Sequence, residues 1–121
     1  MKLRLYHFDL QLRHPFTISR ETITTQPTLI VELQMDGVSG YGEATANPYY
    51  GRDVDGMLRL LKKNQSKIET ANWEHPAELW ETLEQDLRTD TFAQCALDQA
   101  AYDLWGKREQ KRVSPQAEDI D

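Results

Sequence analysis

Residues 29–43 read LIVELQMDGVSGYGE, and this stretch decides the fold of the chain. Its first half has apolar side chains at every second position, which is the period of a strand with one buried face. These side chains are Leu29, Val31, Leu33 and Met35. Asp36-Gly37 follows, and this dipeptide suits a two-residue type I′ turn because both central positions need positive φ. Residues 38–43 are therefore predicted to return antiparallel to residues 29–35 as a β-hairpin.

A further strand is predicted upstream of this hairpin. Apolar and polar side chains alternate through residues 6–13, as they do in a half-buried strand. The apolar set consists of Tyr6, Phe8, Leu10 and Leu12. Leu3 and Leu5 lie out of phase with this set, which predicts a bulge or a twist near residues 5–6. The three strands together predict an antiparallel meander.

The apolar period changes to that of helices after Asp53. A first apolar stripe runs from Val54 to Ile68, with Asp53 or Asp55 available as the N-cap. A second helix is predicted to begin at Pro76, because proline suits the first turn of a helix. Strands followed by helices predict an α+β fold, here a three-stranded antiparallel meander followed by a bundle of about three helices.

The third predicted helix has the strongest pattern. Thr91 and Gln94 are predicted to form a capping box, and Gly106 is predicted to end the helix. One face carries small side chains that would let another element approach closely, namely Ala93, Leu97, Ala100, Ala101 and Leu104. The apolar period ends after Gly106. We therefore expect a domain over residues 1–107 and a disordered tail over residues 108–121.

Composition excludes several classes of function. The chain has 121 residues, one cysteine and a net charge of −6, so a surface for nucleic acid is not expected. A single cysteine allows no internal disulfide and fits a reducing compartment. No apolar run is long enough to span a membrane, and the first residues lack the apolar core of a signal peptide. These features predict a soluble, cytoplasmic protein.

Few residues are candidates for chemistry. Arg20 lies in a Pro-bounded connection, residues 14–27, where a guanidinium can pair with a substrate carboxylate, although a solvated arginine is the plainer interpretation. Tyr49 and Tyr50 can form either an aromatic pocket wall or a packing plug. The three histidines are far apart in sequence, and Cys95 is predicted to be a small buried side chain. No catalytic residue and no metal site are predicted within the chain.

Four segments, taken in order, resemble a known family. They are PFTISR at residues 15–20, GYGEA at 40–44, PYYG at 48–51 and ALDQAAYDLWGK at 96–107. In this order and spacing they are similar to the N-terminal capping domain of the enolase superfamily, in the muconate-lactonizing branch that includes mandelate racemase. Among its members, the dipeptide epimerases that act on L-Ala-D/L-Glu are the most similar. The resemblance covers about residues 1–107.

The resemblance implies a division of labour between two domains. The cap would sit over a (β/α)₈-type barrel that carries acidic Mg²⁺ ligands and two acid/base lysines, which remove and return the α-proton of a small dipeptide or carboxylate substrate. Phe16, Ser19 and Arg20 would belong to one specificity loop of the cap. Tyr49 and Tyr50 would belong to the other. Arg20 then becomes the best candidate to contact a dipeptide carboxylate.

Residues 108–121 depart from the family pattern. A (β/α)₈ barrel needs about 200 residues or more, and they are not in this chain. We therefore expect a truncated cap that is inactive alone and that self-associates through its exposed barrel-facing surface, including the small-residue helix and both loops. The alternative is a stand-alone α+β interaction module that retains the cap fold.

Overall fold

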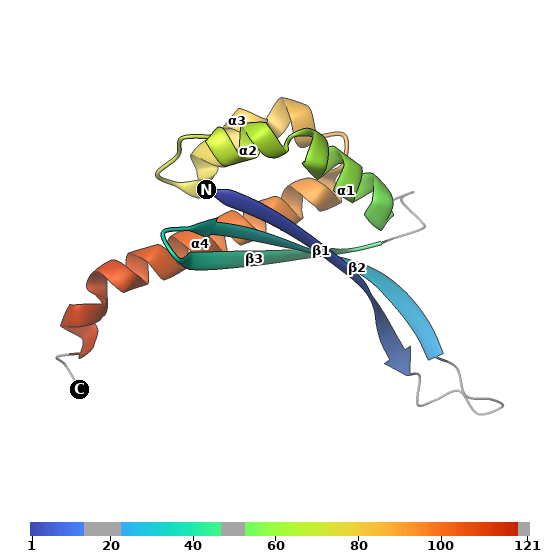
Figure 1. The fold of residues 1–121 in the computed structure, drawn as a ribbon, viewed down its shortest axis with the longest axis horizontal. Helices are drawn as coiled ribbons and strands as arrows, with labels where there is room; N and C mark the ends of the chain where they lie inside the picture. The colour runs from blue at the N-terminus through green and yellow to red at the C-terminus, as the bar shows by residue number, and fades with distance from the viewer. Residues whose placement is uncertain (14–22, 47–52, 119–121) are drawn as a thin grey trace.

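The fold consists of a sheet covered on one face by helices (Figure 1). The computed structural model describes residues 1–13, 23–46 and 53–118, with side chains described for residues 1–9, 26–46 and 53–110. The elements in chain order are β1 (Lys2–Arg13), β2 (Ile23–Met35), β3 (Val38–Thr45), α1 (Val54–Lys63), α2 (Gln65–Thr70), α3 (Pro76–Leu87) and α4 (Thr91–Glu118). The sheet is antiparallel in the order β1-β2-β3, which confirms the predicted α+β meander followed by helices.

The β2–β3 hairpin closes at the turn that the sequence predicted. Met35 pairs with Val38, and the two residues between them have positive φ, 54° at Asp36 and 78° at Gly37. Glycine adopts this conformation freely, and aspartate is among the side chains that tolerate it. The turn sets the register of the whole hairpin, up to Thr28 opposite Thr45.

β2 begins earlier than expected, because the predicted connection over residues 14–27 included part of it. Pro27 lies within β2 and pairs with Asp9, although proline has no N–H to give to a neighbouring strand. Proline is tolerated here because Pro27 precedes Thr28, the first residue of β2 that pairs with β3. The β2–β3 ladder therefore does not need an N–H from residue 27. The Pro27 carbonyl still accepts a hydrogen bond from the Ala46 N–H at 3.0 Å.

The predicted bulge in β1 is wrong. The pairing with β2 runs without interruption from Lys2 opposite Gln34 to Arg13 opposite Ile23. Leu3, 5% exposed, faces the helices, whereas Tyr6 and Phe8 are each 45% exposed on the opposite face. Both faces of β1 are apolar, and the helices cover the one that carries Leu3.

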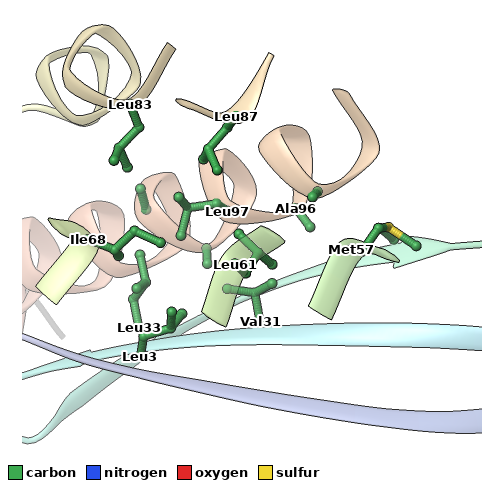
Figure 2. Packing of buried hydrophobic residues seen from close by; sticks show 14 of the residues in the cluster. Leu3, Val31, Leu33, Met57, Leu61, Ile68, Leu83, Leu87, Ala96 and Leu97 are labelled. Carbon is green, nitrogen blue, oxygen red and sulfur yellow. The ribbon is translucent and has the colours of Figure 1, made fainter. Parts of the chain in front are cut away.

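The core lies between β2 and the helices (Figure 2). Leu29, Val31 and Leu33 are fully buried on the sheet. The helices contribute Met57, Leu61, Ile68 and Leu104, which are also fully buried. Burial of such side chains contributes about 1.5–3 kcal/mol each relative to exposure. The sheet and the helices therefore share one core.

Helix α4 packs directly against β3 because two glycines remove the side chains between them. A Cβ added to Gly40 would lie 2.3 Å from the Ala100 carbonyl oxygen, and one added to Gly42 would lie 1.9 Å from the Ala96 carbonyl oxygen. Ala96 and Ala100 are fully buried. The small-residue face of this helix is thus covered by the chain's own sheet. The expectation that it is exposed for self-association is wrong.

The same helix also occupies the free edge of β3. Three α4 side chains spaced by four residues bind backbone groups of β3 spaced by two. The Glu43 N–H donates to Gln99 at 3.2 Å, the Tyr41 N–H donates to Asp103 at 2.9 Å, and Lys107 donates to the Ser39 carbonyl at 2.9 Å. The spacings match because four helical residues rise about 6 Å and two strand residues about 6.8 Å.

The helix starts agree with the sequence except at α4. Asp53 caps α1, and His75 caps α3, which has Pro76 in its first turn. The stripe predicted for one first helix is divided between α1 and α2 at Asn64. The predicted Thr91–Gln94 capping box is wrong: the Asp90 carboxylate accepts from the Phe92 and Ala93 N–H groups, and Gln94 donates to Glu84.

The predicted end of the third helix is also wrong. Helix α4 passes through Gly106 and continues to Glu118, and its C-terminal part extends beyond the sheet (Figure 1). Glycine inside a helix costs only about 1 kcal/mol relative to alanine. Lys107, Arg108, Glu109 and Gln110 are good helix formers, so the loss of apolar period after Gly106 does not end the helix. Residues 107–118 are therefore part of α4.

None of the helices in the described part of the chain is both long enough and apolar enough to span a membrane.

Candidate functional site

The substrate-binding residues predicted from sequence lie outside the described residues. Phe16, Ser19 and Arg20 fall in residues 14–22, and Tyr49 and Tyr50 fall in residues 47–52. The structure does describe the residues that flank both segments. Arg13 pairs with Ile23 at the end of the β1–β2 hairpin, while Ala46 and Asp53 bound the second segment.

Ala46 and Asp53, which bound the second segment, lie beside β1 and β2 at one end of the sheet. The β1–β2 hairpin extends past the end of β3, from Asp9 opposite Pro27 to Arg13 opposite Ile23 (Figure 1). A groove of about 260 Å³ lies beside it. Its lining comes from β1, β2, the end of β3 and the start of α1, and consists of His7, Phe8, Asp9, Pro27, Ala46, Asp53, Val54 and Asp55. Residues that are far apart in sequence thus surround one hollow.

The rim of this groove is acidic. Asp9, Asp53 and Asp55 are exposed, and His7 beside them is also exposed. The Asp53 carboxylate is engaged in capping α1, where it accepts from the Gly56 N–H at 2.6 Å. No group of three or more potential metal ligands occurs in the described part of the chain. The described residues therefore shape a hollow and do not themselves provide the donor set of a metal centre.

A second polar feature lies on the sheet face opposite the helices. The Glu32 carboxylate, on β2, is only 5% exposed. It accepts hydrogen bonds from the Tyr6 hydroxyl at 2.6 Å, the Ser39 hydroxyl at 2.6 Å and the Tyr41 hydroxyl at 3.3 Å. These donors come from the strands on either side, β1 and β3. The Glu32 carboxylate thus connects all three strands through hydrogen bonds.

The hydroxyl groups stabilise the charged form of Glu32. Hydrogen bonds from Ser39 and then Tyr6 hold the pKa of Glu32 below its ordinary value, against the opposing effect of burial. The hydrogen bond between Tyr6 and Glu32 also raises the pKa of the Tyr6 hydroxyl above its ordinary value. Glu32 is therefore ionised in the folded protein at neutral pH.

This arrangement predicts a pH-dependent contribution to stability. The folded pKa of Glu32 is lower than the unfolded pKa, so its contribution is complete above the unfolded value of about 4.3 and is lost as the pH falls through the folded pKa. We expect the urea-derived free energy of unfolding to fall below about pH 4.5. The fall should be shallower in Glu32→Gln than in the unaltered chain.

The pKa values of Asp103 and Glu69 are also lowered in the folded protein. The free energy of unfolding of Glu32→Gln is therefore still expected to fall with decreasing pH, with a smaller slope. Glu81→Gln, at an exposed position on α3, provides the control and should leave the slope unchanged. Equal slopes in Glu32→Gln and the unaltered chain would contradict the assignment.

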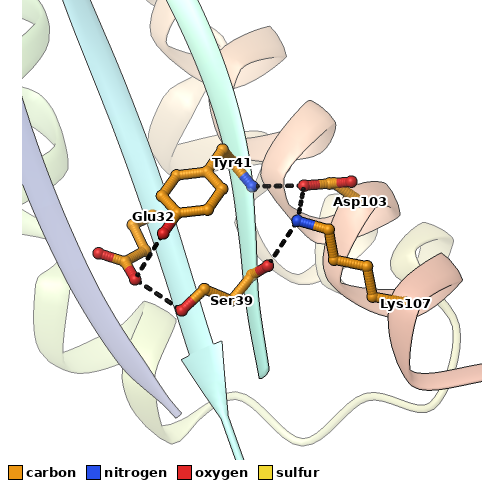
Figure 3. A network of polar contacts seen from close by, with 5 residues as sticks. All are labelled: Glu32, Ser39, Tyr41, Asp103 and Lys107. Carbon is orange, nitrogen blue, oxygen red and sulfur yellow. Dashed lines mark hydrogen bonds and ion pairs between the residues drawn. The ribbon is translucent and has the colours of Figure 1, made fainter. Parts of the chain in front are cut away.

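The polar network continues from the sheet into α4 (Figure 3). Asp103 accepts from the Tyr41 N–H and forms an ion pair of 2.9 Å with Lys107. The Lys107 ammonium also lies 5.1 Å from the centre of the Tyr41 ring, within the range of a cation–π contact. Tyr41 therefore links Glu32 on the sheet to the C-terminal half of α4.

Sequence reasoning missed Glu32, although the register carried a signal. The predicted hairpin places Glu32 opposite Tyr41, and the structure pairs it with Arg4 on the other side. Tyr41 directly opposite, with Tyr6 and Ser39 on the diagonals, would have been recognisable as hydroxyl-bearing neighbours once the three strands were aligned. Cys95 was predicted to be buried but is exposed on α4, so that prediction is wrong.

The motif around Gly40 and Gly42 has a packing role in the described structure. Its glycines admit α4, and the backbone N–H groups of Tyr41 and Glu43 bind α4 side chains. The Glu43 side chain is exposed. The second motif, residues 96–107, supplies the matching helix face. These two segments therefore fix the position of α4 on the sheet.

The chain is similar to known proteins over most of its length. The family described as mandelate racemase / muconate lactonizing enzyme, N-terminal domain, matches residues 2–115. The L-Ala-D/L-amino acid epimerase of Flavobacterium johnsoniae is 49% identical over 113 residues, which make up 93% of this chain and 34% of that protein. The L-Ala-D/L-Glu epimerase of Bacteroides thetaiotaomicron is 36% identical over 88% of this chain and 28% of its own length.

A solved structure is also similar. An L-Ala-D/L-Glu epimerase superposes with a TM-score of 0.64 at 26% identity, covering 90% of this chain and 31% of that structure. The chain thus spans about a third of the length of the relatives that it matches. The matching family is described as an N-terminal domain, and about two thirds of each of these relatives lies outside the match.

Proposed function

Since this chain belongs to the mandelate racemase / muconate lactonizing enzyme family, as its N-terminal domain, we propose that it is the substrate-specificity cap of a Mg²⁺-dependent, cytoplasmic dipeptide epimerase. The reaction is removal and return of the α-proton of an L-Ala-D/L-Glu-type dipeptide. The groups that move the proton reside in a barrel domain, the partner of this cap. On its own the cap is inactive.

The groove at the end of the sheet carries the proposal. Ala46 and Asp53, which bound one predicted specificity segment, line the same hollow as His7 and Asp9 of the strand that leads to the other. This arrangement supports the proposal that both segments act at this end of the sheet. A cap that closes over a substrate requires such an arrangement, because substrate-contacting loops must converge on one position above the barrel.

The cap contributes shape and recognition. The described residues do not fit a Mg²⁺ site, since no group of three potential ligands occurs among them, and the proposal assigns the metal to the barrel. Arg20, Phe16 and Ser19 are proposed to contact the substrate from one loop, and Tyr49 and Tyr50 from the other. An arginine pairs bidentately with a carboxylate, so Arg20 is proposed to recognise the side-chain carboxylate of the dipeptide.

The proposal predicts an active hybrid that depends on Arg20. In this hybrid, the present chain replaces the matching 113 residues of the Flavobacterium johnsoniae epimerase, which is 49% identical there. We expect Mg²⁺-dependent epimerisation of L-Ala-L-Glu by the hybrid, and none by the cap alone. Arg20→Met should lower kcat/KM by about 10- to 100-fold, the loss expected for a charge-assisted pair.

Two controls separate recognition from folding. Arg59→Met removes an exposed arginine on α1 and should leave kcat/KM unchanged. A dipeptide whose side-chain carboxylate is replaced by an amide should react equally well with the hybrid and with Arg20→Met, because it lacks the group that Arg20 binds. An inactive but folded hybrid, or an Arg20→Met effect that persists with the amide, would contradict the proposal.

A further inference from the structure

The two free edges of the sheet are treated differently by the rest of the chain. At β3, three side chains of α4 bind outward backbone groups: Gln99 binds Glu43, Asp103 binds Tyr41 and Lys107 binds Ser39. Side chains that occupy an edge in this way prevent another strand from pairing there. At β1, the other edge, only one such contact exists among the described residues: the Leu3 N–H donates to Glu69 at 2.9 Å.

The Leu3 contact identifies which groups of β1 point outward. Backbone groups of alternate residues face opposite sides of an antiparallel strand, so the N–H and C=O groups of Leu5, His7 and Asp9 face the same open side as those of Leu3. None of these three backbone N–H groups has a hydrogen-bond partner in the described part of the chain. Among the described residues, the β1 edge from Leu5 to Asp9 therefore presents a row of backbone N–H groups that lack a partner.

The residues of this edge are complementary to themselves. Pairing of outward groups requires an odd-numbered residue opposite an odd-numbered residue. One antiparallel register with a two-fold axis at Phe8 places His7 opposite Asp9 of a second copy, and Asp9 opposite His7. Both side chains are exposed, so an imidazole and a carboxylate can meet twice across the strands. The exposed Phe8 rings, 45% accessible, would meet at the axis.

We propose that two copies of this chain pair through their β1 edges, antiparallel about Phe8, to form one continuous six-stranded sheet. Closed two-fold pairing uses the same patch on both partners, which the reciprocal His7–Asp9 pairs satisfy. An unrelated extended peptide could satisfy the backbone groups, but it would not supply both of these side-chain pairs by symmetry. The occupant is therefore a second copy, and the interface is distinct from the buried small-residue face of α4.

Proline at position 7 tests the backbone pairing. His7→Pro removes an outward N–H while keeping every β1–β2 hydrogen bond, because the His7 N–H faces away from β2. His7→Ala is the matched control, since it also loses the imidazole but retains the N–H. Sedimentation equilibrium of the full 121-residue chain over a concentration series should show dimers for the unaltered chain, weaker dimers for His7→Ala and monomers for His7→Pro.

A charge exchange tests the register. Asp9→Lys should raise the dimer dissociation constant by at least about tenfold, because it places like charges opposite each other when His7 is protonated and removes the His7–Asp9 hydrogen bond otherwise. The double variant H7E/D9K should have a dimer dissociation constant within about threefold of that of the unaltered chain, because it exchanges the two charges across the strands. Far-ultraviolet circular dichroism and thermal unfolding of each variant establish that the monomer is folded.

Amide hydrogen exchange then locates the interface. The amides of Leu5, His7 and Asp9 should be protected in the dimer and should exchange rapidly in folded His7→Pro at its unaltered positions. The proposal is overturned if the unaltered chain remains monomeric throughout the series. It is equally overturned if dimers form without protection of these amides, if His7→Pro dimerises as well as His7→Ala, or if H7E/D9K fails to recover.

Discussion

Gly42→Ala is expected to destabilise the chain by at least about 3 kcal/mol, a large share of the roughly 5–15 kcal/mol that stabilises a typical domain. The added Cβ would lie 1.9 Å from the Ala96 carbonyl oxygen and 2.8 Å from the Ala100 nitrogen. Both atoms belong to the backbone of α4, so no side-chain rotation relieves the contact. Helix and strand must separate, which weakens the core that they share. Urea unfolding followed by circular dichroism measures the loss.

Gly106→Ala is the matched control, because it adds the same methyl group to open space. No atom lies within 4 Å of a Cβ at this position, and Gly106 lies inside α4. Alanine replaces glycine in a helix interior with a gain of about 0.5–1 kcal/mol, so this variant should be more stable than the unaltered chain. A Gly42→Ala chain as stable as the original would contradict the close α4–β3 packing. A destabilised Gly106→Ala chain would contradict the continuous helix.

Leu61→Ala is expected to cost about 2–5 kcal/mol. Leu61 is fully buried, on the face of α1 that packs in the shared core (Figure 2). Removing its side chain leaves a cavity that the surrounding strands and helices close only in part. The loss should appear in one cooperative unfolding transition, because α1 and the sheet belong to the same core.

Leu60→Ala is the neighbouring control. Leu60 is half-buried at the edge of the same core, so its truncation should cost less than half as much as that of Leu61. Both variants can be compared by urea unfolding with tryptophan fluorescence and circular dichroism recorded together. Equal effects at the two positions, or separate transitions for the two probes, would show that α1 does not pack on the sheet as described.

The paired glycines connect these stability predictions with function. Two of the four segments that carry the family resemblance, residues 40–44 and 96–107, build the α4–β3 interface. The groove that carries the proposed function lies at the far end of the same sheet. A rigid interface of this kind holds the β1–β2 hairpin and the start of α1 in fixed relation. Loops that recognise a substrate require such a support.

Elements set by local rules could be predicted from the sequence. The Asp36-Gly37 turn, the Asp53 cap and the start of α3 at Pro76 each depend on residues within a few positions of one another. Local rules failed at Gly106, where the cost of one glycine was too small to end a helix whose following residues favour helical structure. They also failed at Thr91, because the Asp90 carboxylate, one residue earlier, caps the helix by accepting from the Phe92 and Ala93 N–H groups.

Features that depend on distant residues required the tertiary structure. In β1, the sequence offered two apolar faces, one with Leu3 and Leu5 and the other with Tyr6 and Phe8, and the helices decided between them. Glu32 gains its buried, ionised state from hydroxyl groups on β1 and β3. The predicted substrate residues of both loops stay predictions, and the structure describes a groove that Ala46 and Asp53, the residues bounding one of the two segments, help to line.

The sequence by itself determined the order of elements, the hairpin register and the family, because turn chemistry, caps and apolar period act between near neighbours. The tertiary structure decided which face of β1 is buried, why Gly40 and Gly42 are needed and which edge of the sheet stays open. Each of these depends on contacts between segments more than 50 residues apart, such as Tyr41 with Asp103. The physical reason is that burial and edge pairing are properties of packed surfaces, and only the assembled layers create those surfaces.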